Sequence, residues 1–121
     1  MVRILAIAAA VALAAATPAI ADAAAGQKAF QAQCAICHAA VAGGRKIGPS
    51  LYGVVGRTSG TLPGFNYSAA MKAAAIVWSG TELATYLEAP TKRVPGTKMA
   101  YLGLRDPQKR ADVVSYLETL K

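Results

Sequence analysis

Apolar residues recur at helical spacing near the start of the sequence, and glycine and proline then interrupt the pattern. Within residues 24–40, Gly26, Phe30 and Cys34 stand at positions i, i+4 and i+8, on one face of a predicted helix. Residues 41–64 carry seven glycines and two prolines, too many for one long element. A short apolar group lies among them: Leu51, Tyr52, Val54 and Val55. We therefore predict an irregular segment that wraps around something apolar.

Two further helices are predicted in the middle of the chain. Residues 67–75 are typical of a short helix. Ser79 and Glu82 have the spacing of a capping box, in which both side chains accept from free N–H groups at a helix start. This second helix should end just before Pro90, because a residue that precedes proline avoids the helical conformation.

The C-terminal residues predict the last helix. Asp106 would cap its start, and Pro107 would take its first position, where a missing N–H has no consequence. One apolar stripe runs along it: Val113, Val114, Tyr116, Leu117 and Leu120. Residues 90–104 predict a loop. Since no stretch alternates as a strand would, the sequence predicts an all-α fold.

The first 21 residues have the pattern of a secretory signal peptide. Arg3 gives a positive start, residues 4–16 an apolar run, and residues 19–21 a small-residue cleavage site. We predict cleavage after Ala21, so that one domain of residues 22–121 is exported to the periplasm. The apolar run is shorter than the roughly 20 residues of a membrane span. An uncleaved segment that tethers the domain to the membrane is the alternative.

The net positive charge of the chain limits the classes of partner that it can bind. The sequence has 13 basic and 6 acidic residues, and only Arg3 would leave with the signal peptide. A basic surface suits nucleic acid, a membrane face or an acidic protein. For an exported protein we exclude nucleic acid.

The most specific chemistry lies in Cys34, Cys37 and His38. A C-x-x-C-H sequence is the attachment pattern of c-type haem, in which two thiols bond the porphyrin and the histidine binds the iron. A structural zinc site would need a fourth ligand, and the sequence has no other Cys or His. A thioredoxin-like dithiol should follow a strand, and no strand pattern precedes Cys34. The dithiol and disulfide interpretations remain as lesser alternatives.

The second axial ligand of such an iron would be a methionine, because there is no second histidine. Met1 leaves with the signal peptide. Met71 lies on a predicted helix, where methionine commonly fills a core. Met99 lies in a predicted loop, which can present its sulfur opposite His38, and we predict Met99 as the ligand.

From Gly26 to the C-terminus the sequence resembles class I c-type cytochromes, the mitochondrial-type cytochrome c and its bacterial relatives. The segments that carry the resemblance are residues 34–38, 48–51, 53–57, 63–67, 76–78, 86–90 and 94–99. The resemblance implies a small fold of about four to five helices with long loops around one covalently bound haem c. It also implies that the first and last helices cross, with Gly26 and Phe30 against Val113, Tyr116 and Leu117.

The resemblance also implies roles for further side chains and backbone groups. The Pro49 carbonyl would accept a hydrogen bond from the free ring nitrogen of His38 and so orient the ring. The residues expected around the haem propionates are Arg57, Tyr67 and Trp78, and those expected near Met99 are Tyr86 and Thr97. Met71 stands where the mitochondrial proteins usually carry Asn, which implies a more apolar pocket.

With both axial positions filled, the expected function is one-electron transfer rather than catalysis on a small-molecule substrate. We expect a soluble monomer that shuttles between a membrane reductase complex, such as ubiquinol:cytochrome c reductase, and a terminal oxidase or photosynthetic reaction centre. Basic residues near the exposed haem edge would steer docking onto acidic partners: Lys28, Arg45, Lys46, Lys92, Arg93, Lys98 and Arg105. The alternative is a peroxidase or gas sensor with a labile Met99 bond.

Overall fold

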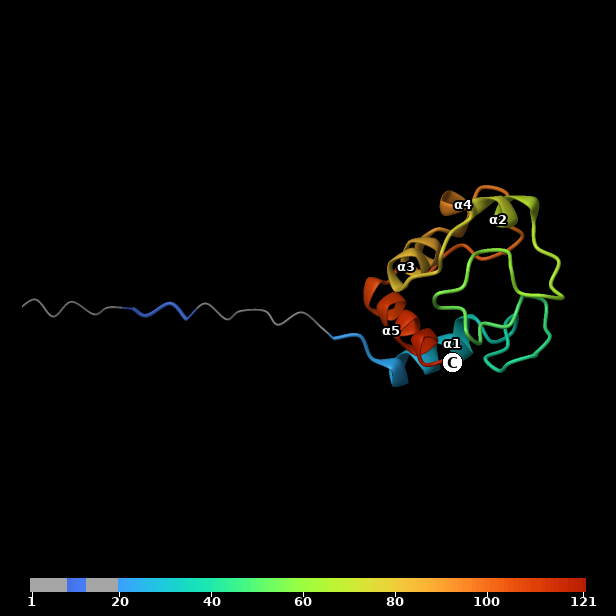
Figure 1. Cartoon of the computed structure of the whole chain (residues 1–121). Helices are drawn as coiled ribbons and strands as arrows, with labels where there is room; N and C mark the ends of the chain where they lie inside the picture. Colours follow the sequence, from blue (N-terminus) through green and yellow to red (C-terminus); the bar gives the residue numbers. More distant parts are fainter. Residues whose placement is uncertain (1–8, 13–19) are drawn as a thin grey trace, which may run out of the picture.

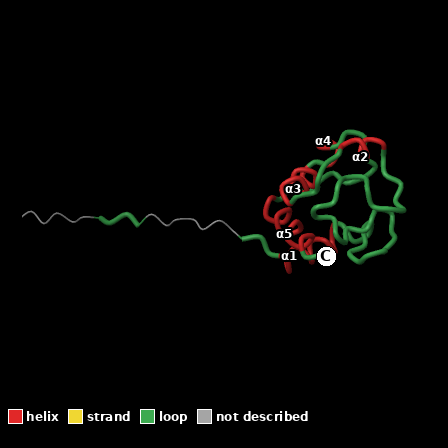
Figure 2. Tube along the Cα trace, viewed as in Figure 1, coloured by secondary structure: helices red, strands yellow, loops and turns green. Residues whose placement is uncertain are grey.

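The fold consists of five helices joined by long loops. The computed structural model describes residues 9–12 and 20–121, and most of the predicted signal peptide lies outside them. The helices are α1 (Ala23–Gln33), α2 (Ala69–Ala74), α3 (Gly80–Glu88), α4 (Pro90–Arg93) and α5 (Pro107–Glu118) (Figure 1). Within the described residues there is no strand, only an isolated bridge between Thr58 and Val77 (Figure 2). The predicted all-α fold is confirmed.

The two terminal helices, α1 and α5, pack against each other as predicted (Figure 1). Gly26 faces the backbone of α5, which lets the helices approach closely. The rings of Phe30 and Tyr116 have centroids 5.3 Å apart. Val113 and Leu117 are almost fully buried beside them. This contact joins the two ends of the domain and forms one side of its core.

The first helix ends earlier than predicted. The apolar spacing extends to residue 40, but α1 ends at Gln33. The N–H groups of Cys34 and Ala35 both donate to the Phe30 carbonyl, at 2.7 and 2.9 Å. The Ala35 bond spans five residues and widens the last turn, so the regular helical ladder stops there. One further turn follows, in which the His38 N–H donates to the Cys34 carbonyl at 2.9 Å.

The third helix begins and ends as predicted, although its capping box is only half formed. The Ser79 hydroxyl accepts from the Glu82 N–H at 3.2 Å, and α3 ends at Glu88. The Glu82 carboxylate does not accept a hydrogen bond from the Ser79 N–H, which donates to the Val77 carbonyl instead. The carboxylate pairs with Arg93, at 3.1 Å from both Nε and Nη2. This ion pair joins α3 to α4.

The prediction of a loop throughout residues 90–104 is wrong for its first turn. Pro90 opens α4, because proline is well suited to a first helical position. The Val94 N–H closes the turn on the Pro90 carbonyl at 2.9 Å. The remaining residues, up to Leu104, form the loop that carries Met99.

The long segment of residues 41–64 is irregular, as predicted, and hydrogen bonds hold it in place. The Trp78 N–H donates to Arg57 O at 2.9 Å, and the Gly56 N–H donates to Trp78 O at 2.8 Å. The buried Ser59 hydroxyl accepts from the Ile76 N–H at 3.0 Å. Residues 56–59 are therefore attached to residues 76–78, which follow α2.

Candidate haem site

Two thiols lie on the turn that follows α1. Cys34 and Cys37 are free, half-buried cysteines. The Cys37 N–H donates to Cys34 O at 3.0 Å, so the turn presents both side chains from one short piece of backbone. Cys34 packs against the core, whereas Ile36 between the two cysteines points to solvent and is 81% exposed.

The ionisation of Cys34 argues against a reactive dithiol. Burial, and then the neighbouring Cys37, raise the pKa of Cys34 to about 11. A thioredoxin-like motif needs the opposite shift, because its nucleophile is the thiolate. Within residues 9–12 and 20–121 no group of three or more Cys, His or acidic side chains is arranged so that it could hold a metal ion.

The imidazole of His38 is oriented by the segment that follows it. Its Nδ1 lies 2.7 Å from the Pro49 carbonyl oxygen, the contact that the resemblance implies. A carbonyl can only accept, so Nδ1 carries the proton and Nε2 keeps a free lone pair. Burial, helped by Lys46 and opposed by the Pro49 bond, lowers the pKa of His38 and favours this neutral ring. Neutral imidazole is the form that binds metals.

Gly48 forms a close contact with this ring that sequence reasoning missed. A Cβ atom at Gly48 would lie 2.5 Å from His38 Cε1 and 2.8 Å from Nδ1. The Gly48 N–H also donates to Cys37 O at 2.7 Å. Only glycine therefore allows residues 48–49 to approach the imidazole so closely.

The two candidate methionines have different surroundings. Met71 lies on α2, is 9% exposed and belongs to the buried core. Met99 is half-buried in the loop after α4 and packs at the edge of the same core. Its N–H lies 3.4 Å from the Thr97 hydroxyl, which in turn lies 2.8 Å from the Tyr86 hydroxyl. The structure thus brings Tyr86, Thr97 and Met99 together.

Of the three side chains expected around the propionates, two bond to backbone groups of the long loop and the third is buried. Arg57 donates to the Ser50 and Tyr52 carbonyls, each at 3.2 Å. The Tyr67 hydroxyl accepts from the Leu62 N–H at 3.3 Å. Trp78 is buried, and its ring centroid lies 5.1 Å from that of Tyr86. The Arg57 and Tyr67 contacts therefore help to hold the long loop in shape.

A further contact joins the methionine loop to the cysteine turn. The Tyr101 hydroxyl donates to Gln33 Oε1 at 3.2 Å, and Gln33 directly precedes Cys34. Burial, and then the nearby Cys34, raise the pKa of Tyr101. The residues after Met99 therefore lie beside the start of the C-x-x-C-H turn, although 68 positions separate Gln33 from Tyr101 in the sequence.

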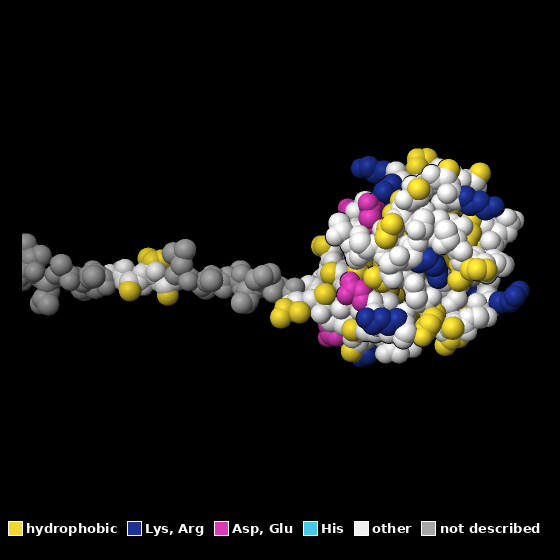
Figure 3. Space-filling model, viewed as in Figure 1, with side chains coloured by type: hydrophobic (Ala, Val, Ile, Leu, Met, Phe, Trp, Pro, Cys, Tyr) yellow, Lys and Arg dark blue, Asp and Glu magenta, His cyan; other side chains and the backbone are white. Residues whose placement is uncertain are grey.

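The predicted docking cations divide into free and engaged groups. Four have exposed side chains that form no hydrogen bond or ion pair with another residue of 9–12 or 20–121: Lys28, Arg45, Lys92 and Arg105. Arg93 is half-buried against Glu82, Lys46 donates to the Ala35 carbonyl, and Lys98 donates to Asn66 O at 2.8 Å. On the face in Figure 3, Lys and Arg are widely spread, whereas the carboxylates gather near α3 and α5.

A small all-helical fold with a C-x-x-C-H turn and an oriented neutral imidazole defines a c-type haem protein. Comparisons agree. The cytochrome c family model matches residues 23–121. Cytochrome c2 of Rhodopila globiformis is 56% identical over 96 residues, which cover 79% of this chain and 91% of that protein. Cytochrome c of Euglena viridis is 50% identical over 100 residues, or 83% and 98% of the two chains.

A solved structure is also similar. Cytochrome cH from Methylobacterium extorquens has a TM-score of 0.76 and 42% identity, and the match covers 81% of this chain and 98% of that one. The present chain belongs to the cytochrome c family. It is an electron-transfer protein rather than an enzyme, and its cofactor is one covalently attached haem c. No helix among the described residues is long and apolar enough to span a membrane.

Proposed function

We propose that this protein is an exported one-electron carrier whose haem is bonded through Cys34 and Cys37, with His38 and Met99 as axial ligands. The observation that carries this assignment is the His38–Pro49 bond, which leaves Nε2 as the free donor atom. When bound, the haem iron supplies the site that gains and loses the electron. The chain's own part is to hold the imidazole and the thioether still.

Met99 is preferred over Met71 as the thioether because of where each side chain lies. Met71 is enclosed in the core, whereas Met99 is only half-buried and lies on a loop tied by Thr97. The test compares Met99→Ala with Met71→Ala in the visible spectrum, with and without carbon monoxide after reduction. We expect gas binding and a lower reduction potential only in Met99→Ala. The reverse result would assign the ligand to Met71.

The same spectra test the alternative of a peroxidase or gas sensor. An iron with both axial positions filled has no place for a substrate, so the unaltered protein should not bind carbon monoxide while folded. Rapid binding by the native protein would favour the alternative and contradict the assignment of Met99 as a stable ligand.

For the partners, we propose acidic patches on a membrane reductase and on an oxidase or other acceptor. The exposed cations Lys28, Lys92 and Arg105 support this, since complementary charge accelerates association. The association rate with either partner should fall steeply as salt rises. Lys92→Gln should weaken this dependence more than Lys109→Gln, which also removes an exposed charge but lies outside the predicted docking set. Equal effects would indicate a general basic surface.

Export and processing complete the proposal. The sequence pattern of residues 1–21 supports removal of that segment and release into the periplasm. The intact mass of the natural protein tests this, because a chain that starts at Asp22 and carries one haem has a unique mass. A full-length mass would favour a membrane-tethered carrier.

A further inference from the structure

One buried carboxylate has no part in the haem site. Asp112, on α5, is 7% exposed, and its Oδ1 accepts from the Asp22 N–H at 2.8 Å and from Gln108 Nε2 at 3.0 Å. Both donors are uncharged. Within residues 20–121 the two ion pairs are Arg93–Glu82 and Arg110–Glu88, so Asp112 has no cationic partner there. A buried carboxylate without an opposite charge is costly, and an opposite charge with good geometry and hydrogen bonds offsets that cost.

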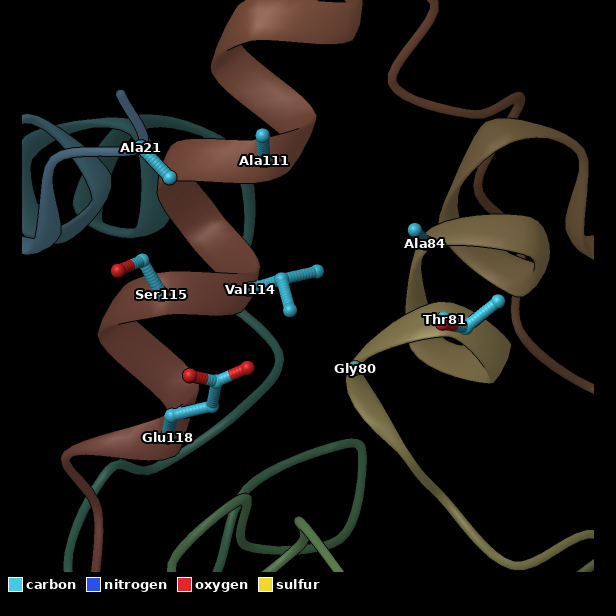
Figure 4. Close-up of a pocket in the computed structure, with 8 residues that line it drawn as sticks. All are labelled: Ala21, Gly80, Thr81, Ala84, Ala111, Val114, Ser115 and Glu118. Atoms are coloured by element: carbon cyan, nitrogen blue, oxygen red, sulfur yellow. The ribbon is translucent and has the colours of Figure 1, made fainter.

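The nitrogen that meets Asp112 belongs to the residue at the predicted cleavage site. Asp22 is the N-cap of α1, and its own side chain accepts from the Ala24 and Ala25 N–H groups at 2.8 and 3.2 Å. Ile20 and Ala21, on the other side of the bond, are exposed. Figure 4 shows Ala21 near α5, at the groove that Ala111 and Ser115 also line.

We propose that cleavage between Ala21 and Asp22 creates an ion pair between the new α-ammonium and Asp112, which ties the start of α1 to α5. Water hydrolyses the peptide bond: Ala21 leaves as a carboxylate, and the Asp22 nitrogen gains protons and becomes a cation in the place where its N–H already donates. This inference rests on the processing site proposed above. Signal removal then adds stability to the folded domain as well as releasing it.

Both neighbouring negative charges favour the new cation. A positive charge at a helix N-terminus is normally disfavoured, because the helix dipole is positive there. Here the cation would lie beside Asp112 from α5 and the side chain of Asp22 itself from α1. The pair also lies one turn before Gly26, which contacts the Asp112 carbonyl and Tyr116. It therefore acts on the closest part of the α1–α5 contact.

The test uses haem-loaded proteins with defined starts, made behind an interchangeable signal peptide. One starts at Asp22 and the other at Ala21, which moves the ammonium one residue away and leaves the Asp22 N–H as an amide. Each is made with Asp112 and with Asp112→Asn, and unfolding in guanidinium chloride is measured at pH 7. We expect the Asp22 start to have a folding equilibrium constant about tenfold larger when Asp112 is present. With Asp112→Asn the two starts should be equal.

Controls separate this result from general effects of charge. Glu118→Gln removes an exposed carboxylate from the same helix and should leave the tenfold difference intact. An equal difference in the Asp112 and Asp112→Asn backgrounds, or no difference in either, would overturn the ion pair.

A pH series needs no variant and serves if Asp112→Asn folds poorly. The carboxylates raise the α-amino pKa in the folded state above its unfolded value of about 8. The extra stability of the protein that starts at Asp22 should therefore be complete below pH 8. It should disappear as the pH rises through the α-amino pKa of the folded state. A difference that does not change with pH contradicts the proposal. A natural chain that starts elsewhere overturns the processing step, whereas the haem spectra test electron transfer independently.

Discussion

Replacing Gly26 with alanine tests how closely the terminal helices must approach. A Cβ at Gly26 would overlap the carbonyl oxygen of Asp112 and lie 2.5 Å from its carbonyl carbon and 2.9 Å from Tyr116 Cβ. Ordinary contact begins at 3.4 Å. Two of these atoms are backbone, which cannot swing aside as a side chain can. The contact with the carbonyl carbon alone requires α1 and α5 to separate by about 0.9 Å, and the overlap with the carbonyl oxygen requires more.

This separation would weaken the packing of the layer beneath. Phe30, Val113 and Leu117 are among the most buried side chains and lie between the same two helices. A gap of 0.5–1 Å forfeits roughly a quarter to a half of each contact energy, and overpacking typically costs about 1–3 kcal/mol. Alanine gains about 1 kcal/mol over glycine as a helix former. Because the clash is with backbone atoms, we expect the overpacking cost at its upper end, about 3 kcal/mol. Gly26→Ala should then lower the unfolding free energy by about 2 kcal/mol net, which is a fall in Tm of roughly 10 °C.

The matched control is Gly80→Ala, the same change at the start of α3. There the new Cβ would lie 2.9 Å from Glu118 Oε1, the end of a flexible side chain, and 3.4 Å from Val114 Cγ1. Glu118 can move, and Gly80 is the first residue of α3, where the helix-propensity gain of a helix interior does not apply in full. The control should therefore stay within about 0.5 kcal/mol of the unaltered protein. Both are measured by guanidinium chloride unfolding followed by far-UV circular dichroism. If Gly26→Ala were as stable as the control, the close helix contact would not be a packing constraint.

Three further predictions follow from single contacts. Gly48→Ala should displace the His38 ring and break the hydrogen bond between that ring and the Pro49 carbonyl. The loss should lower the unfolding free energy by about 1 kcal/mol and change the visible spectrum of the haem. An unaltered spectrum would contradict the close contact. Ala75→Gly should raise the unfolding free energy by about 0.5–1 kcal/mol, because Ala75 ends α2 in the left-handed conformation with φ 50°. Thermal unfolding measures this change, and a loss of stability would refute it. Burial, opposed by the hydrogen bond to Thr97, raises the pKa of Tyr86 in the folded state. The unfolding free energy should therefore fall as pH rises above about 10, and it should fall less steeply in Tyr86→Phe. Parallel curves of unfolding free energy against pH for the two proteins would exclude this origin.

The sequence predicts those parts of the fold that depend on local chemistry. Ser79 and Asp106 mark the starts of α3 and α5 because a capping side chain bonds an N–H only two or three residues away. The C-x-x-C-H turn is equally local. The end of α1 was harder to predict, because the apolar pattern continues beyond Gln33 although the helical hydrogen bonds stop there. Apolar spacing records which side faces the core and says little about where the backbone changes conformation.

Contacts between distant residues were beyond sequence reasoning. Glu82 had a plausible local partner in Ser79 and instead pairs with Arg93. The Tyr101–Gln33 and Asp22–Asp112 bonds join residues 68 and 90 positions apart, and neither pair has a local signal. These contacts close the fold around the site and join its two ends. They depend on the complete arrangement of the helices, which no single segment encodes.

The irregular loop after His38, the proposed iron ligand, holds the imidazole in place through several hydrogen bonds. On one side of Pro49, the Gly48 N–H donates to Cys37 O at 2.7 Å; on the other, the Leu51 N–H donates to Ala39 O at 2.9 Å. These two bonds attach the loop to the residues directly before and after His38. The Pro49 carbonyl is therefore held at the imidazole by its neighbours on both sides, and proline itself restricts the backbone between them. If His38 binds the iron as we propose, an imidazole held this way has little freedom to move when the charge on the metal changes, which suits rapid electron transfer better than substrate binding.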